Sequence, residues 1–473
     1  MTSPETSSGP APPTEGIRWG AVIACGLAVF ITAVDLNVVG VALPALGARF
    51  DAAPAAMQWV ILAYALPMVA LILPAGRWGD TVDKREAFVF AVVGFGLASV
   101  FVAVSQSLEM MIVARVVQAL FGALISSLVL ATIAQSVRPQ LMGRAMGLVA
   151  SLGPLGGAVG PAGGGLLIDA LGWQAAFLIN VPVCLVAAWL AWVSVPRGTL
   201  GLHPPRPRWL IDVLMLGVAG TALLLGLQEF GRPGAGAAIG GVLLVAGIVT
   251  LVFWLRRKDA KPVMALFADP FVNRWLIALL FGAVLSGVLN FITPFLLVDG
   301  IGVSNGVTGF TMLALSAGMV VFAPLGGALT DRSGPRPVSI VGGILLLAGA
   351  TLLVSGSTEW GAVDIAWRLA LVGAGTGLLA GPTQAAVMMS APPHLGATAG
   401  ALSALLLNLG FAVGPAAGSL AWQLTGGEIT RTGPAYLVGA AAATIALALL
   451  VATRRPRPPA TPEAPVAKEQ PAG

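Results

Sequence analysis

Apolar stretches of about 20 residues recur along the whole chain, and this pattern constrains the fold more than any other feature. At about 1.5 Å per residue, such a stretch forms a helix that spans the hydrocarbon core of a bilayer. Of the 473 residues, 57% are hydrophobic and only 10% are charged, whereas a soluble domain carries about 25% charged residues. A transmembrane β-barrel would instead show alternating segments of about ten residues. The sequence therefore predicts an all-α membrane protein.

We expect about fourteen transmembrane helices. The predicted spans are 20–44, 58–75, 87–104, 110–134, 145–168, 174–194, 211–228, 237–255, 275–298, 309–329, 338–355, 363–382, 398–421 and 434–452. The longest internal loops are 196–209 and 256–273, and they bracket the seventh and eighth helices.

Three short patterns occur twice, in the same order and with a nearly constant displacement. Gly76, Asp80 and Arg85 match Gly327, Asp331 and Arg336; Arg115 and Gly122 match Arg368 and Gly375; Gly156, Gly160, Pro161 and Gly164 match Gly410, Gly414, Pro415 and Gly418. Two six-helix halves are typical of transporters that rock about a central site.

The repeat divides the chain into an N-terminal six-helix bundle, 19–195, and a C-terminal six-helix bundle, 274–453. Residues 196–273 hold the two inserted helices, which carry no evident intramembrane charge and are expected at the periphery. The polar, Pro-rich ends, 1–18 and 454–473, are predicted to be disordered cytoplasmic tails.

The distribution of the 25 Lys and Arg residues predicts the orientation. With both termini cytoplasmic, only Arg49, Arg232 and Arg431 fall in outer loops, and Arg115 and Arg368 fall inside predicted helices. All the others are cytoplasmic, as the positive-inside rule requires. We therefore predict a multi-pass protein of the bacterial inner membrane. Its basic loops would meet anionic membrane lipids, so the high pI implies no nucleic-acid partner.

Four segments resemble motifs of the major facilitator superfamily, and within it of the fourteen-helix drug–proton antiporters. The segment 76–85 resembles the loop motif between helices 2 and 3, and Arg115 with Gln118 resembles the helix-4 motif of proton-coupled members. The segment 156–164 resembles the helix-5 motif of antiporters, and 35–44 the helix-1 motif of the fourteen-helix branch. The resemblance covers about residues 20–455 and implies proton-driven export by alternating access.

The chain departs from these motifs at Asn37, Gly40 and Asp83, where the family usually has Thr, Asn and Gly. Some multidrug members carry extra acids in the second half, and none is apparent deep in the spans 275–298, 309–329 or 398–421 here. This difference argues against broad recognition of cationic drugs.

Asp35 is the one acid well inside a predicted helix, where an ionisable group costs about 3 kcal/mol on insertion scales. Since burial favours the neutral carboxyl, Asp35 is a candidate to load and release a proton. Arg115 is its candidate partner, because their estimated depths differ by roughly 5 Å. Arg115 could reach the carboxylate directly or bond the backbone beside it. The alternatives are a structural hydrogen bond for Asp35 and a snorkelling side chain for Arg115.

Gly76, Asp80 and Arg85 lie in one short cytoplasmic loop, which Asp331 and Arg336 repeat in the second half. An acid docked on a helix N-terminus and basic groups would form a conformational latch; the alternative is an ordinary solvated turn. The motif of Gly156, Gly160, Pro161 and Gly164 is expected to seal helices across the half interface, or else to serve generic packing. Arg368 follows Asp364 by four residues, which predicts a local pair.

Five polar residues in predicted helices are candidates to line a substrate cavity: Asn37, Tyr64, Gln118, Asn290 and Asn408. Each could instead form an interhelical hydrogen bond. No enzymatic constellation, metal-ligand spacing or phosphate loop is apparent, so neither an enzyme nor a metal or cofactor is expected.

The expected partners are a small-molecule substrate, protons and membrane lipids, and we expect a monomer. Export of a small amphipathic compound is the favoured function. Export or flipping of a lipid-like molecule is second, and uptake by proton symport is third. A lone intramembrane acid disfavours a channel, which would show a ring of charges.

Overall fold

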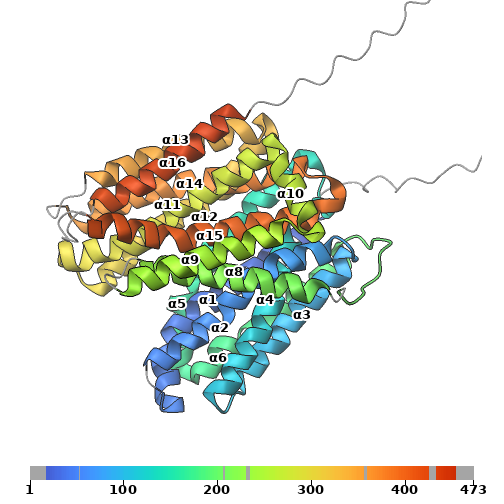
Figure 1. Cartoon of the computed structure of the whole chain (residues 1–473), viewed down its shortest axis with the longest axis horizontal. Helices are drawn as coiled ribbons and strands as arrows, with labels where there is room; N and C mark the ends of the chain where they lie inside the picture. The colour runs from blue at the N-terminus through green and yellow to red at the C-terminus, as the bar shows by residue number, and fades with distance from the viewer. Residues whose placement is uncertain are drawn as a thin grey trace, which may run out of the picture.

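The computed structural model describes residues 18–52, 54–205, 208–230, 235–355, 360–424 and 433–453, and over these residues the chain is helical without any strand (Figure 1). The α-helices are α1 Trp19–Phe50, α2 Pro54–Gly79, α3 Lys84–Ala103, α4 Leu108–Ser136, α5 Met142–Leu171, α6 Trp173–Leu178, α7 Asn180–Ser194, α8 Arg208–Phe230, α9 Ala235–Leu255, α10 Lys261–Ala268, α11 Pro270–Phe295, α12 Asn305–Ser333, α13 Pro335–Val354, α14 Ala362–Ser390, α15 Gly396–Leu424 and α16 Gly433–Ala452. Apart from Arg18, the predicted tails lie outside the described residues.

Twelve helical segments among the described residues are long and apolar enough to cross a membrane. The prediction of an all-α, multi-pass membrane protein is therefore confirmed. The predicted spans 145–168 and 211–228 fall on α5 and α8, which are helical but do not belong to these twelve. Glycines, prolines and Arg144 lower the mean hydropathy of α5. The count of fourteen spans stays a prediction.

Each half of the molecule packs its first helix against its fifth through small residues. Gly156, Gly160 and Gly164 of α5 lie against the α1 backbone and side chains so closely that a Cβ would collide. Gly410 and Gly414 of α15 lie in the same way against α11. The nearest neighbours of these glycines thus lie on α1 of the same half, whereas the motif was expected to seal helices across the half interface. Pro161, in the same motif, is exposed.

The two halves meet through α2, α4 and α5 on one side and α12, α14 and α15 on the other. Gly143 and Gly327 approach each other so closely that neither could carry a side chain, and Gly147 lies against Ala323. Gly76 lies directly on the backbone of Ala397. All these residues lie near the end of the bundle where the basic loops gather, which we call the basic end. The molecule is therefore sealed at the basic end.

Toward the opposite end, the first and fifth helices present exposed faces. Asn37 and Gly40 of α1 are exposed, and no atom lies within 4 Å of a Cβ built on Gly40. Asn408 and Phe411 of α15 are exposed as well. These faces are accessible while the basic end is closed.

The inserted segment packs against the N-terminal half, since α8 lies beside α2 and α9 (Figure 1). Gly217 and Gly220 of α8 allow this contact, because Cβ atoms there would meet Ala70 and Val69. The expectation that the inserted helices carry no intramembrane charge is wrong at Asp212. This acid in the first turns of α8 is 1% exposed, and its partners lie on other segments.

Substitution of Gly373 tests the close helix packing on which the fold depends. A Cβ there would collide with the carbonyl of Leu315 and lie 3.1 Å from Gly318. We expect Gly373→Val to cost about 1–3 kcal/mol by overpacking and to lower the melting temperature in detergent. Gly309→Val is the matched control, because nothing lies within 4 Å of its Cβ. Equal melting temperatures for the two variants would contradict this account of the packing.

Candidate functional site

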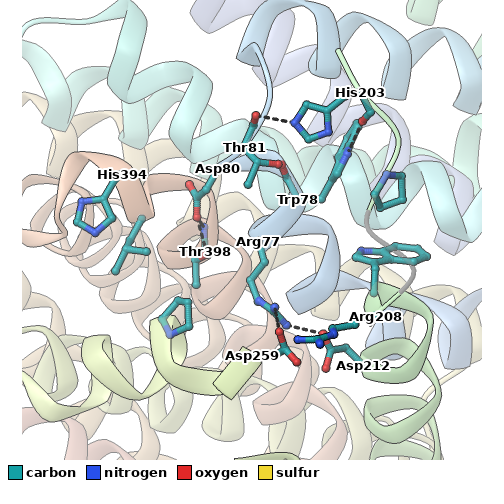
Figure 2. Close-up of a pocket in the computed structure, with 14 residues that line it drawn as sticks. Arg77, Trp78, Asp80, Thr81, His203, Arg208, Asp212, Asp259, His394 and Thr398 are labelled. Carbon is teal, nitrogen blue, oxygen red and sulfur yellow. Dashed lines mark hydrogen bonds and ion pairs between the residues drawn. The ribbon is translucent and has the colours of Figure 1, made fainter. Parts of the chain in front are cut away.

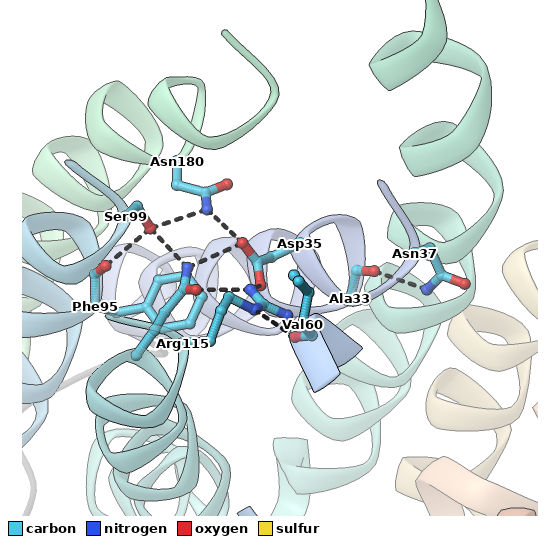
Figure 3. A network of polar contacts seen from close by, with 9 residues as sticks. Ala33, Asp35, Asn37, Val60, Phe95, Ser99, Arg115 and Asn180 are labelled. Carbon is cyan, nitrogen blue, oxygen red and sulfur yellow. Dashed lines mark hydrogen bonds and ion pairs between the residues drawn. The ribbon is translucent and has the colours of Figure 1, made fainter. Parts of the chain in front are cut away.

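A buried polar network surrounds Asp35 inside the N-terminal half (Figure 3). Asp35 and Arg115 are both 0% exposed, and the Arg115 Nη1 donates to Asp35 Oδ2 at 2.6 Å. Gln118 Nε2 and Asn180 Nδ2 each donate to Asp35 Oδ1 at 2.9 Å. The same two amides also donate to the Ser99 hydroxyl, at 2.8 and 3.0 Å. The carboxylate thus accepts three hydrogen bonds from two helices, α4 and α7.

The local sequences of α4 and α7 bring the side chains that bind Asp35 to the same level of the bundle. Arg115 and Gln118 are three residues apart, so both side chains leave the same face of α4, and Arg115 Nη1 also donates to Gln118 Oε1 at 2.6 Å. The sixth span is divided into α6 and α7, and Asn180 begins α7 at the level of Asp35. Ser99 keeps its own donor on the carbonyl of Phe95 at 2.9 Å and so accepts from both amides.

The guanidinium of Arg115 is held from several sides. Its Nε donates to the carbonyl of Val60 at 3.3 Å, and its Cζ lies 4.5 Å from the centre of the Tyr64 ring. Removing one member of a buried pair costs about 3–5 kcal/mol, because the other charge is left uncompensated. Arg115 Nη2, Tyr64 Oη and Asn180 Oδ1 are buried without a hydrogen-bond partner in the described part of the chain. These three atoms are therefore hydrogen-bonding groups that the network holds in reserve.

The structure places Asp35 and Arg115 in direct contact, the first of the two arrangements expected from the sequence. Gln118 and Tyr64, predicted as cavity candidates, are buried around this pair instead. Ser99 and Asn180 were missed. Asn180 could have been found, because it is the one amide inside the apolar span 174–194 beyond its first residue, Gln174, whereas Ser99 has no such signal.

The other three cavity candidates are exposed. Asn37, Asn290 and Asn408 each donate through Nδ2 to the carbonyl four residues earlier on their own helix, at 2.8, 2.9 and 2.8 Å. Among the described residues, these bonds stay within one helix, and the alternative of an interhelical hydrogen bond is not realised. Each leaves its side-chain carbonyl free to accept from a solute.

Asp80 docks on the opposite half of the molecule. It directly follows α2 and accepts from the backbone N–H groups of Ala397 at 2.7 Å and Thr398 at 2.9 Å, and from the Thr398 hydroxyl (Figure 2). These groups form the start of α15, where a negative charge is favoured by the helix dipole. Burial raises the pKa of Asp80, and the hydrogen bonds from Thr398 and Ala397 partly offset the rise. We call this contact the Asp80 latch.

Asp331 makes the reciprocal contact from the second half. It lies in the last turn of α12 and accepts from the N–H of Gly143 at 2.8 Å and of Arg144 at 3.2 Å. Arg144 Nε also lies 3.4 Å from the carboxylate. Each half therefore caps the fifth helix of the other half, and we call this second contact the Asp331 latch.

Arg85 and Arg336, predicted with these acids, lie elsewhere. Arg85 Nη1 donates to the carbonyl of Trp192 at 3.3 Å and its guanidinium lies over that indole. Arg336 Nη2 donates to the carbonyl of Val451 at 2.8 Å. Both bind the last carbonyls of the sixth span of their own half, a favourable place for a cation. They hold each half together and do not join the two halves.

The described residues of the second half form no equivalent of the Asp35 network. Helix packing aligns α1 with α11, since Gly164 lies against Val38 and Gly418 against Val288. This alignment puts Leu285, fully buried, at the position of Asp35. The predicted local pair in the second half is confirmed, with Arg368 and Asp364 3.8 Å apart. No group of three or more metal-ligand side chains gathers among the described residues.

A family model described as "Major Facilitator Superfamily" matches residues 25–298 and again 274–472. The chain belongs to the Major Facilitator Superfamily. The membership predicted from the motifs is confirmed.

Several curated relatives within this superfamily are similar over most of the chain. A tetracenomycin C resistance and export protein of Streptomyces glaucescens is 29% identical over 85% of this chain and 76% of its own length. The drug efflux pump JefA of Mycobacterium tuberculosis is 32% identical over 74% of this chain and 69% of its own length. A probable actinorhodin transporter of Streptomyces coelicolor is 29% identical over 91% of this chain and 78% of its own length.

The fold is also that of solved superfamily members. The human organic anion transporter MFSD10 superposes with a TM-score of 0.66 at 15% identity, over 92% of this chain and all of that one. The likeness at this identity concerns the fold alone.

Replacement of Asp80 tests whether its contact holds the halves together. The reporter is Ser127→Cys, a 0% exposed position on the seam between α4 and α15, with the buried Cys25 and Cys184 replaced by Ala. We expect Asp80→Asn to increase maleimide labelling of the reporter about tenfold, since charge-assisted hydrogen bonds contribute about 1.5–3 kcal/mol. Asp364→Asn, which alters only a local pair, should leave labelling unchanged. Unchanged labelling in Asp80→Asn would refute the latch.

Proposed function

We propose that this protein is a proton-coupled antiporter that exports small amphipathic compounds, such as drugs, antibiotics or metabolites, by alternating access. The observation that carries the proposal is the fully buried pair of Asp35 and Arg115, 2.6 Å apart in a bundle whose buried side chains are mostly apolar. A buried carboxylate with one cationic partner is suited to reversible protonation, because gaining a proton neutralises it and releases the arginine.

The proposed cycle uses the two latches as the inner gate. The structure is sealed at the basic end and exposes Asn37 and Asn408 toward the other end, as expected of a state open to the outside. Protonation of Asp35 would free Arg115 to rebind Tyr64, Asn180 or backbone groups around it, and so change the packing of α1 against α4. Undocking of Asp80 and Asp331 would then open the basic end to substrate.

The exposed polar groups suggest a substrate with little charge. Asn37, Asn290 and Asn408 offer neutral acceptors among apolar walls, and Asp35 is withdrawn from the surface. Relatives named for export of tetracenomycin C and for actinorhodin transport favour bulky amphipathic metabolites. Export or flipping of a lipid-like molecule is the second candidate, because a neutral, apolar surface would also suit it; uptake by symport is third.

We propose the bacterial inner membrane as the location, with the basic end and both termini in the cytoplasm. We further propose a monomer as the working unit and contacts with anionic lipids at the basic loops.

Cysteines at two exposed positions test the orientation: Gly201→Cys at the basic end and Gln106→Cys at the other. In intact cells a membrane-impermeant maleimide should label Gln106→Cys only, and Gly201→Cys should react after permeabilisation. The reverse pattern would overturn the orientation.

Asp35→Asn tests the coupling. A compound that the protein exports is first identified by growth of a pump-deficient host on a panel of amphipathic antibiotics. In proteoliposomes with an imposed pH gradient, we expect Asp35→Asn to abolish concentrative transport. A variant that moves no proton gains no free energy from the proton gradient, whereas each charge moved across 100 mV is worth about 2.3 kcal/mol. Exchange of the compound down its own gradient should persist, since the amide has nearly the volume of the carboxyl.

Since α11 carries Leu285 at the equivalent position, one principal proton site per cycle is expected. The control is Asp364→Asn, which leaves the buried network intact and should transport normally. Concentrative transport at the wild-type rate by Asp35→Asn would show that Asp35 is structural.

A further inference from the structure

The inserted segment makes a dense set of polar contacts to the end of α2, beside the Asp80 latch (Figure 2). Arg77, three residues before Asp80, donates through Nη1 to Asp212 of α8 at 2.6 Å. Its Nη2 lies 3.4 Å from Asp259, in the short helix that follows α9. We call Arg77, Asp212 and Asp259 the clamp.

Asp212 is the centre of the clamp, because it is 1% exposed and fully engaged. Its second oxygen accepts from Trp254 Nε1 at 3.0 Å, and Arg257 Nε lies 3.8 Å from it. Trp254 itself is 1% exposed. A buried carboxylate that binds two arginines and an indole fixes the relative position of α8, α9 and α2.

The loop before α8 adds a second tie to the same turn. Trp78 Nε1 donates to the carbonyl of His203 at 2.9 Å, and the His203 Nε2 lies 3.0 Å from the carbonyl of Thr81. Asp83 accepts from the backbone N–H of Gly198. The turn that carries Asp80 is therefore held on both flanks by the inserted segment.

The inserted segment also reaches the C-terminal half. Asp259 lies just before α10, which packs against α11 and α15 and buries Val263 and Leu266. A cavity of about 350 Å³ is lined by residues of the clamp and of the Asp80 latch, among them Asp259 and Thr398, and by Pro262 of α10. The inserted segment thus bridges the two halves at the gate. Opening the basic end would separate α2 from α15. The contacts of the inserted segment would then break, or the inserted segment would move together with one half.

We propose that Asp212 is a positioning residue for the Asp80 latch: through Arg77 it holds the end of α2 so that Asp80 meets the start of α15, and it biases the protein toward the state closed at the basic end. This inference rests on the proposed alternating-access function. It gives the inserted helices a role in gating, whereas the sequence suggested only a peripheral position.

Asp212→Asn tests the proposal with two reporters in the Cys25→Ala, Cys184→Ala background. Ser127→Cys reports on the basic-end seam, and Gly40→Cys reports on the exposed face of α1 toward the other end. We expect labelling at position 127 to rise about fivefold, as loss of roughly 1 kcal/mol of bias predicts, and labelling at position 40 to fall. A merely structural defect would raise both.

Asp259→Asn is the second variant, because this side chain is 23% exposed and its loss should not disturb folding. It should shift both reporters in the same directions, by a smaller factor. Asp364→Asn is the matched control and should move neither. All variants are compared as full-length protein that elutes as one peak in detergent.

The outcomes separate this inference from the proposed function. If Asp80→Asn opens the seam but Asp212→Asn and Asp259→Asn leave both reporters unchanged, the clamp has no positioning role and the latch stands. If Asp80→Asn also has no effect, the gate itself is wrongly assigned. A rise at both reporters in Asp212→Asn, with no shift in Asp259→Asn, would make Asp212 structural.

Discussion

A charge inside an apolar bundle must be paired or bound by several hydrogen bonds, and the polar organisation of this protein follows from that constraint. Asp35 binds Arg115 and two amides, and Asp212 binds Arg77 and Trp254. Asp80 and Asp331 instead take backbone N–H groups at helix starts. Because each solution needs partners from other helices, each acid fixes how neighbouring helices are placed.

The two halves share their gate but not their ionisable core. Asp80 and Asp331 make equivalent contacts, each to the fifth helix of the other half, and glycines such as Gly143 and Gly327 let the backbones approach at the same level. The core differs, since Leu285 stands where the first half has Asp35. This difference supports the proposal that a single buried acid, Asp35, is coupled to both latches.

The inserted segment is joined to the gate more closely than its apolar helices suggest. Its acids bind Arg77 at the end of α2, its loop binds Trp78 and Thr81, and α10 packs on the other half. A contact that spans both halves at the closed end adds to the stability of that state only. The proposed clamp and the Asp80 latch therefore act on the same equilibrium from neighbouring positions.

The sequence by itself determined the helical membrane fold, the internal repeat and the superfamily, because apolar length and repeated motifs are local properties of the chain. It also singled out Asp35, Arg115, Asp80 and Asp331, since charges are conspicuous against an apolar background. Partners were decided by tertiary structure. Ser99 and Asn180 join Asp35 only because α3 and α7 pack beside α1, and Arg85 turned away from Asp80 to bind its own half. The sequence drew no attention to Asp212, because its burial against Arg77 depends on the packing of α8 on α2, which are distant in sequence.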